Sequence, residues 1–574
     1  MASESSPRER GRPSLDEIQP ADDIAVTSSS SSAVSVSPPL SAAANPASEA
    51  PPALTVTGGT ESSQNHTAFS TAQKRLIVCM VTLASFFSPL SGQIYYPVIP
   101  TLAENYHLTP ALINLTITTY MLLQGLAPAF MGTFADAGGR RPAYILAFTI
   151  YTAANIGLAV QNSYPALMVL RCIQSAGSSG TVSFGYGVIA DIATPAERGT
   201  YVGPMAAGIM IAPALGPVIG GLLAKFLGWR SVFWFLVIIS GGFLAVYIIL
   251  VPETARKIVG DGSALPAEWW RRSVVQWWQQ RSLIQDGTND GTTATIRTAS
   301  STAGTTTATA RASTLRFPNP LKSFAILLER DALIIISYIG LVMLSNVALL
   351  TSTPSLFTEI YGFNNLEIGL CFLPLGVGAA LGAITNGKIL DWNYRRHALA
   401  HNFPVDRKRA TDLRHFPIEH ARLQSFFPII LLSIASYLPY GWVLQQRAHL
   451  SAPLILQFLN GFATIASSNT LNTLLVDLFP DRPATAAAAC NLVRCWLGAL
   501  GAAVVDYMLR SMGWGWCFVF LGLVMLVGTG MMWVEYVFGS GWREKRAMKK
   551  EKKERVSKHS NSELGGSVHV GFEV

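Results

Sequence analysis

Long apolar runs dominate this chain of 574 residues and constrain its fold more than any other feature. Each run has about the length that a helix needs to cross a bilayer core, which is roughly 30 Å thick. Six runs precede a long polar segment and six follow it, which predicts an all-α polytopic membrane protein with twelve transmembrane helices in two six-helix, pseudo-symmetric halves. The predicted spans are 76–98, 111–134, 142–160, 165–190, 199–224, 231–251, 332–352, 366–390, 425–444, 452–476, 485–508 and 515–537.

The composition supports a membrane protein and excludes several other classes. Half of the residues are hydrophobic and 13% are charged, whereas soluble domains carry about a quarter of charged residues. The net charge of +8 gathers in loops and near the C-terminus, which is the positive-inside pattern rather than a nucleic-acid footprint. The six cysteines lie inside apolar runs without the spacing of metal ligands. We therefore expect the lipid bilayer as surroundings, no nucleic-acid partner, no metal and no cofactor.

The polar stretches divide the chain into five segments. Residues 1–73 are rich in Ser, Pro and Ala and lack apolar periodicity, which predicts a disordered tail. The two halves are predicted at 74–256 and 330–540, with a linker at 257–329 between them and a basic tail at 541–574. Because basic residues mark the cytoplasmic side and the span count is even, we expect both termini to be cytoplasmic.

A pattern in one loop returns about 250 residues later, which supports two homologous halves. The first copy reads GTFADAGGRRP and the second reads GKILDWNYRR. The shared positions are Gly132, Asp136, Arg140 and Arg141 in the first copy and Gly387, Asp391, Arg395 and Arg396 in the second. We interpret the loop as a latch between the halves, in which Gly permits a tight turn and the charged residues anchor it. A solvated turn whose arginines only fix orientation is the alternative.

The first copy resembles the loop-2/3 signature of the major facilitator superfamily, whereas the second copy lacks the Gly pair. The fourth span opens with RCIQSAGSSG, similar to the span-four signature of drug:proton antiporters, with Ser175 in place of the usual Gly. Arg171 and Gln174 share one helix face, because they are three residues apart. We expect Arg171 to face a wet interior, and the resemblance makes it a candidate for proton coupling. An arginine that extends to the outer surface is the alternative.

The fifth span carries APALGPVIGGLL, in which proline interrupts the helical hydrogen bonds and glycine permits close packing. The gating candidates here are Gly216, Pro217, Gly220 and Gly221, which resemble the span-five antiporter signature of the superfamily. This resemblance implies export rather than import. A packing kink without directional meaning is the alternative.

The predicted spans hold few carboxylates away from their ends but two arginines, Arg171 and Arg494. The candidate substrate-binding residues are Arg171, Gln174, Arg494, Asn491, Gln457, Gln93, Tyr95 and Gln124. Aligning Asp191 with Asp477 places Gln457 where the first half has Arg171, so the halves share a scaffold but not a lining. Fixed positive charge in a low dielectric favours an anion, because arginine binds carboxylates bidentately.

Two polar segments outside the predicted spans each allow two interpretations. Residues 266–283 mix four tryptophans with arginines, which indicates a helix on the inner leaflet or a linker helix packed beneath the bundle. The loop 397–422 is rich in His and Arg without ligand spacing, so we expect a solvated loop rather than a metal site.

The core from about residue 74 to 545 resembles the twelve-span drug:proton antiporter family. The closer likeness is to fungal quinidine-resistance proteins and the fungal citrate exporter, through SPLSGQIYYP, QGLAPAFMGTFAD, GRRP, WRSVFWF and PETAR. The resemblance implies a multi-pass plasma-membrane exporter of small molecules. We expect it to be a monomer coupled to protons, with an organic-acid anion or acidic metabolite as the favoured substrate.

Two other functions stay open. One is a multidrug or secondary-metabolite efflux pump of the same family. The other is a membrane sensor that binds a ligand and signals through its tails without transport. An enzyme is not expected, because the sequence holds no nucleophile–base set, nucleotide-binding loop or metal cluster.

Overall fold

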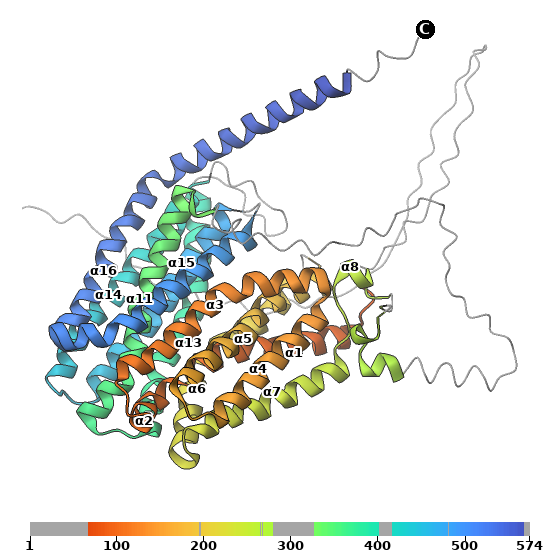
Figure 1. The fold of residues 1–574 in the computed structure, drawn as a ribbon. Coiled ribbons are helices and arrows are strands. Elements are labelled where there is room, and N and C mark those ends of the chain that lie inside the picture. Colours follow the sequence, from red (N-terminus) through yellow and green to blue (C-terminus); the bar gives the residue numbers. More distant parts are fainter. Residues whose placement is uncertain are drawn as a thin grey trace, which may run out of the picture. The chain divides into compact units, whose positions relative to one another are not determined.

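The computed structural model describes residues 67–194, 197–263, 266, 268–278, 326–400, 416–479 and 482–566. Most of the predicted N-terminal tail, much of the linker and much of the His- and Arg-rich loop therefore lie outside the described residues. Those residues form helices and no strand (Figure 1). The elements are α1 Thr71–Gln93, η1 Tyr96–Val98, α2 Ile99–Asn105, α3 Pro110–Gly138, α4 Arg140–Val160, α5 Tyr164–Ile192, α6 Arg198–Leu227, α7 Arg230–Leu250, α8 Arg256–Val259, η2 Trp269–Arg271, α11 Arg330–Tyr361, α12 Asn365–Cys371, α13 Leu373–Ala400, α14 Ile418–Gln445, α15 Ser451–Leu478 and α16 Pro483–Gly566.

Eight helical segments among the described residues are long and apolar enough to cross a membrane. The last of them contains two helices, because α16 turns at Gly513, whose φ of 79° is left-handed. The helices α3, α5 and α15 have comparable lengths of 29, 29 and 28 residues, and polar side chains interrupt their apolar faces. These helices together account for the twelve predicted spans, and the all-α membrane fold is confirmed.

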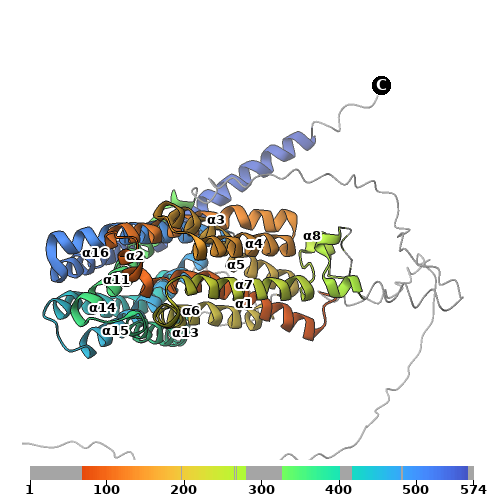
Figure 2. The same cartoon turned by 60° about the horizontal axis from the view of Figure 1, so that its bottom comes forward.

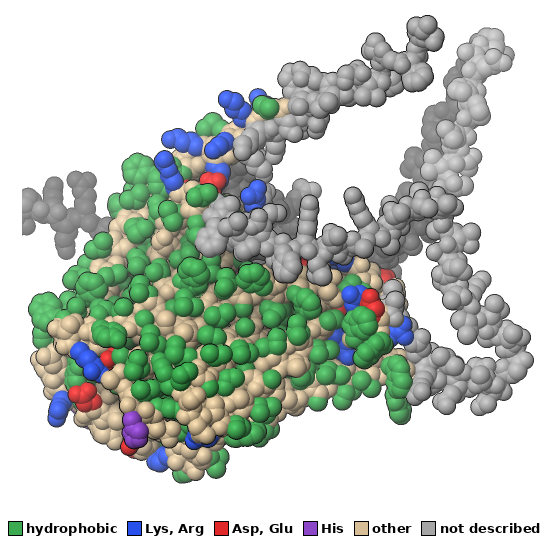
Figure 3. Space-filling model, viewed as in Figure 1, with side chains coloured by type: hydrophobic (Ala, Val, Ile, Leu, Met, Phe, Trp, Pro, Cys, Tyr) green, Lys and Arg blue, Asp and Glu red, His purple; other side chains and the backbone are tan. Residues whose placement is uncertain are grey.

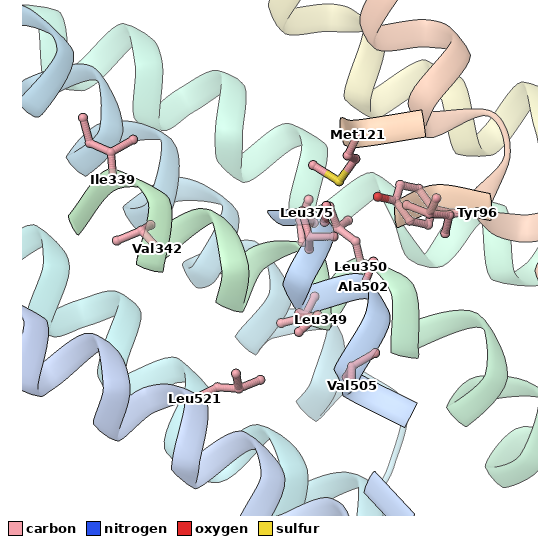
Figure 4. Close-up of a cluster of buried hydrophobic side chains, with 14 of the residues drawn as sticks. Tyr96, Met121, Ile339, Val342, Leu349, Leu350, Leu375, Ala502, Val505 and Leu521 are labelled. Carbon is pink, nitrogen blue, oxygen red and sulfur yellow. The ribbon is translucent and has the colours of Figure 1, made fainter. Parts of the chain in front are cut away.

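Buried apolar side chains form two clusters. The smaller cluster lies within the first half, where the rings of Phe148 and Phe243 pack with centroids 4.5 Å apart. The larger cluster includes residues of both halves, and Figure 4 shows Tyr96 and Met121 of the first half beside Leu375 of the second. Burial of apolar side chains therefore stabilises the contact between the halves as well as the packing within each bundle.

The two halves meet mainly where α3 packs against α16 and where α6 packs against α12 and α13. Figures 1 and 2 both show α6 beside α13. At these contacts glycine lets the backbones approach, because a Cβ on Gly221 would collide with the carbonyl oxygen of Asn365. The Thr101 hydroxyl lies 2.8 Å from the amide nitrogen of Asn365, which ties α2 to the start of α12.

These contacts between the halves lie toward one end of the molecule, which we call the Asn365 end. Within the described residues, the hydrogen bonds and tight glycine contacts between halves involve Thr101 of α2, α3 from Thr118 to Gly125 and α6 from Ala214 to Gly221. Toward the opposite end, where α3 finishes and α4 begins, we find no such bond between described residues of the two halves.

The surface agrees with a lipid environment. Figure 3 shows hydrophobic side chains over the middle of one face and charged side chains toward its ends. In the polar segment after α7, Trp269 and Trp278 are 77% and 71% exposed. Their exposure does not decide between a helix on the inner leaflet and a linker helix beneath the bundle, so both stay predictions.

Candidate functional site

Arg171 is buried in the middle of the first half. It sits on α5 with only 1% of its surface exposed. Its guanidinium carbon lies 4.1 Å from the centre of the Tyr95 ring and 4.3 Å from that of Tyr120. Such cation–π contacts offset part of the cost of removing the charge from water. This burial argues against the alternative in which Arg171 extends to the membrane surface.

A polar network holds the guanidinium in place. Arg171 Nη1 donates to Gln174 Oε1 at 2.6 Å and, at 3.5 Å, to the carbonyl oxygen of Ser91. Gln174 Nε2 in turn donates to Asn155 Oδ1 at 2.7 Å. The three-residue spacing of Arg171 and Gln174 therefore places them on one face, as expected from the sequence. The Nε of Arg171 has no hydrogen-bond partner, so one N–H remains for a ligand.

The equivalent position in the second half is also buried but carries no charge. Gln457 on α15 is fully buried, and its Nε2 lies 2.8 Å from the Tyr440 hydroxyl. Asn460, three residues later, is 1% exposed and lies 3.4 Å from the Ser436 hydroxyl. The two halves thus contain similar polar layers, one built around a cation and the other around a neutral amide.

Arg494 lies on α16 close to the boundary between the halves. Its Nη2 donates to Asn491 Oδ1 at 2.8 Å, and Asn491 Nδ2 donates to the carbonyl oxygen of Gln124 at 3.3 Å. The structure therefore brings Arg494, Asn491 and Gln124 together. Arg494 is partly exposed, and its Nε has no hydrogen-bond partner.

Within the described part of the chain, neither Arg171 nor Arg494 forms an ion pair with a carboxylate. A guanidinium in low dielectric attracts an anion strongly when no fixed carboxylate neutralises it. No hydrogen bond between described side chains links the Arg171 network directly to Arg494 or Gln457. Apart from Gln93, which packs against Gly216, the predicted binding residues therefore form three separate groups in this conformation.

The glycines of α6 make close contacts on two sides. A Cβ on Gly216 would lie 2.8 Å from the Cβ of Gln93, so the end of α1 packs directly on α6. Gly220 faces the carbonyl oxygen of Ile94, whereas Gly221 and Pro217 pack against α12 of the other half. This face of α6 is consequently a contact surface both within the first half and between the halves.

The first copy of the repeated motif forms a tight turn. Gly139 has a φ of 112°, and α4 begins at the next residue. Arg140 pairs with Asp136 at 2.7 Å and with Asp191 at 3.0 Å. The Glu253 carboxylate accepts the backbone N–H of Arg140 at 2.9 Å. Glu253 belongs to the PETAR stretch, which resembles a family motif. Nothing in the sequence indicates that Glu253 contacts this turn.

Arg141 holds the end of α7. It is 2% exposed, and its guanidinium donates to the carbonyl oxygens of Tyr247 at 3.3 Å, Ile248 at 2.7 Å and Val251. A basic side chain at this position is an additional donor for carbonyl groups at the C-terminal end of the helix, where Tyr247 also accepts the Val251 N–H at 3.0 Å. The described contacts of this loop all lie within the first half, so its role as a latch stays a prediction.

The second copy of the motif does not form a turn. Gly387, Asp391 and Arg395 are exposed and lie on the uninterrupted helix α13. The counterpart of the Arg140–Asp191 pair is instead Arg422 on α14, whose Nη2 lies 3.1 Å from Asp477 Oδ2. Arg422 is not among the residues predicted from the sequence, although the match between Asp191 and Asp477 indicated that Asp477 would have a basic partner.

Comparisons with known proteins agree with this architecture. The chain matches the Major Facilitator Superfamily over residues 81–406. It is 40% identical to the MFS-type transporter phiD from a fungal species, over 87% of this chain and 73% of that protein. It is 35% identical to citrate exporter 1 of Aspergillus niger, over 84% of this chain and 89% of that protein. The xylose transporter XylE of E. coli has a similar fold, with a TM-score of 0.55 at 15% identity over 81% of this chain and 98% of that chain.

Proposed function

Because the chain belongs to the Major Facilitator Superfamily, we propose that this transporter exports organic-acid anions by proton-coupled alternating access. The observation that carries the substrate class is Arg171, a buried guanidinium without a carboxylate partner among the described residues. An anionic substrate would supply the missing negative charge and would use the unpaired N–H of Arg171.

Arg494 supports the same substrate class from the other half. It is partly exposed and keeps one unpaired N–H beside Asn491. A substrate with two or three carboxylates would be able to engage both arginines when the halves move relative to each other. The similarity to citrate exporter 1 of Aspergillus niger adds support for a di- or tricarboxylate, although relatives at similar identity carry names without a substrate.

The distribution of contacts between the halves supports alternating access. The described contacts join the halves toward the Asn365 end, through α6 and α12 and through α3 and α16. If both termini are cytoplasmic, this conformation is closed on the outer side. Substrate would then enter from the cytoplasm, and export would require the Asn365 end to open.

Transport in reconstituted vesicles tests the proposal. We expect a pH gradient to drive uptake of labelled citrate or a related di- or tricarboxylate into inside-out proteoliposomes, and a cationic drug such as quinidine to give no flux. Flux of the drug alone would favour a multidrug pump. Binding without flux of any ligand would favour a membrane sensor.

The Arg494→Ala variant makes this test specific to the site. Loss of a charged hydrogen-bond donor is expected to reduce anion flux by about tenfold or more. The matched control is Arg510→Gln, because Arg510 is exposed and pairs with Asp506 on its own helix. Equal flux in Arg494→Ala and wild type would remove Arg494 from the binding site.

A further inference from the structure

Three buried carboxylates meet in the second half, away from the substrate-binding candidates. Asp331 comes from the start of α11, Glu419 from the start of α14 and Glu535 from the second helical part of α16. They are 2%, 0% and 0% exposed. Carboxylates are almost never fully buried unless they are paired, so the partners of this group decide its charge state.

Two of the three carboxylates have an arginine partner. Arg546 Nη2 lies 2.8 Å from Asp331 Oδ2, and Arg543 Nε lies 3.3 Å from Glu419 Oε1. Both arginines are held further, because Arg546 also lies over the Phe479 ring at 4.4 Å and Arg543 Nη2 donates to the carbonyl oxygen of Phe416 at 2.8 Å. Each arginine therefore forms its ion pair with a different carboxylate, and Arg546 also attracts Glu535 without pairing with it.

Glu535 has no such partner. It forms no ion pair within the described residues, and neither of its carboxylate oxygens has a hydrogen-bond partner. The packing around it is tight, since a Cβ on Gly539 would lie 2.7 Å from Glu535 Oε1 and 3.2 Å from Glu419 Cγ. Glu535 is therefore a fully buried acid without an ion-pair partner among the described residues, and it lies close to Glu419.

The surrounding charges do not compensate for Glu535. The cluster contains three buried carboxylates but two guanidinium groups, whose side chains are 16% and 23% exposed. Of the other charged residues nearby, Glu329 is exposed at the start of α11 and adds a further negative charge. His420 follows Glu419 on α14, and its ring packs against Tyr536 at a centroid distance of 4.2 Å.

We propose that Glu535 binds a proton, so that the cluster is a protonation site joining α16 to α11 and α14. Ionising all three carboxylates would leave one buried negative charge without a partner and next to like charge, which is far more costly than binding a proton. A protonated Glu535 carries no charge, so its burial costs less than burial of the ionised form. Its acid O–H is able to donate a hydrogen bond to a neighbouring carboxylate.

Loss of this proton would strain the joint between the three helices. Repulsion from Asp331 and Glu419 would act directly on α16, whereas the two arginines are already occupied by ion pairs. We therefore expect α11, α14 and α16 to pack more stably when Glu535 is protonated. The folded state then binds one more proton than the unfolded chain does, so stability falls as the pH rises through the point at which Glu535 ionises.

The pH dependence of thermal unfolding tests this site in the purified full-length protein. The melting temperature of the wild type is expected to fall, on the order of 3 °C or more, between mildly acidic and mildly alkaline pH. Glu535→Gln mimics the neutral acid and is expected to remove most of that slope. The control is Glu359→Gln, which changes an exposed glutamate on α11 and should keep the wild-type slope. A Glu535→Gln profile that runs parallel to the wild type would overturn the proposal.

An infrared measurement keeps the proposal testable if Glu535→Gln does not fold. We expect wild type with labelled glutamate to give the carbonyl band of a protonated carboxylic acid at mildly acidic pH, with loss of the band at alkaline pH. The absence of such a band throughout would refute proton binding, and its persistence in a folded Glu535→Gln would assign the proton to another residue. Neither measurement involves substrate, so both are independent of the outcome of the transport assay.

Discussion

The Arg422 guanidinium lies 3.1 Å from the Asp477 carboxylate and repeats, in the second half, the 3.0 Å pair between Arg140 and Asp191. Each pair joins α4 to α5 or α14 to α15, which are the third and fourth spans of their halves. The ion pair is preserved between the halves, although its arginine comes from different positions in the sequence pattern. Pseudo-symmetry in this transporter is therefore clearer in the contacts than in the loop motif.

The two acids around Arg140 should differ in their effect on stability. Asp136 is 56% exposed on its side chain, so Asp136→Asn removes a surface pair and is expected to cost about 0.5 kcal/mol or less. Asp191 is 16% exposed, and Asp191→Asn leaves a half-buried guanidinium less well paired, at a cost of about 1–3 kcal/mol. Thermal unfolding of the two variants in one detergent measures the difference. Equal melting temperatures would contradict this ranking.

If the loop acts as a latch, Asp136→Asn should also affect transport. We expect slower turnover with little change in substrate affinity, because Asp136 lies about 18 Å along α3 from Gln124, the binding candidate on that helix, and touches only Arg140 among the described contacts. Concentration-dependent flux in proteoliposomes separates the two parameters. A large loss of affinity with normal turnover would contradict the latch.

Glu253 should be more important for folding than its single charge indicates. It is 2% exposed and accepts the backbone N–H groups of Arg140, Arg141, Thr254 and Ala255. Glu253→Gln replaces a charged acceptor of several bonds by a neutral one, and we expect a loss of about 1–3 kcal/mol. The control is Glu197→Gln, since Glu197 is 51% exposed and pairs only with Lys74 at 3.5 Å. Thermal unfolding that ranks these variants the other way would refute the role of Glu253.

The sequence predicted the spans well because apolar length is a local property. The ends of the helices are predicted less accurately than their existence. The helix α13, for example, continues to Ala400, whereas the predicted span ends at residue 390. The first motif copy turns at Gly139, whereas the second copy lacks a Gly pair and stays helical. Backbone conformation at one glycine therefore separates two loops whose charged residues look alike.

The candidate site was predicted in part. Arg171 and Gln174 follow from helical spacing, and the structure places them in one network. The partners of Arg141, and the Asp191 and Glu253 partners of Arg140, come from segments that are distant in sequence, so no local pattern reveals them. These contacts depend on how the helices pack against one another. The apolar periodicity of the sequence predicts the helices but not their packing.

A methyl group at Gly221 should disturb the contact between the halves. Its Cβ would collide with the carbonyl oxygen of Asn365, whereas a Cβ on Gly241 of α7 meets no atom within 4 Å. Gly221→Ala is therefore expected to shift the population toward conformations in which the Asn365 end is open, and Gly241→Ala is expected to leave it unchanged.

Spin labels at Glu104 and Glu359 measure this shift, because both residues are exposed near the Asn365 end on opposite halves. In a background without native cysteines, the distance between the labels should increase in Gly221→Ala relative to the control. An unchanged distance distribution would indicate that the α6–α12 contact does not control opening at this end.

The substrate proposal depends most directly on Arg171. Arg171→Gln introduces the residue that the second half carries at the equivalent position, where Gln457 is fully buried beside Tyr440. The variant therefore offers a side chain that this polar layer accommodates elsewhere, and it removes the charge, the cation–π contacts and the hydrogen bonds of the guanidinium to Gln174 and Ser91. We expect anion flux to fall at least about tenfold, with an unfolding temperature close to that of the wild type. If a folded Arg171→Gln protein exports carboxylates at the wild-type rate, fixed positive charge at this position does not select the substrate.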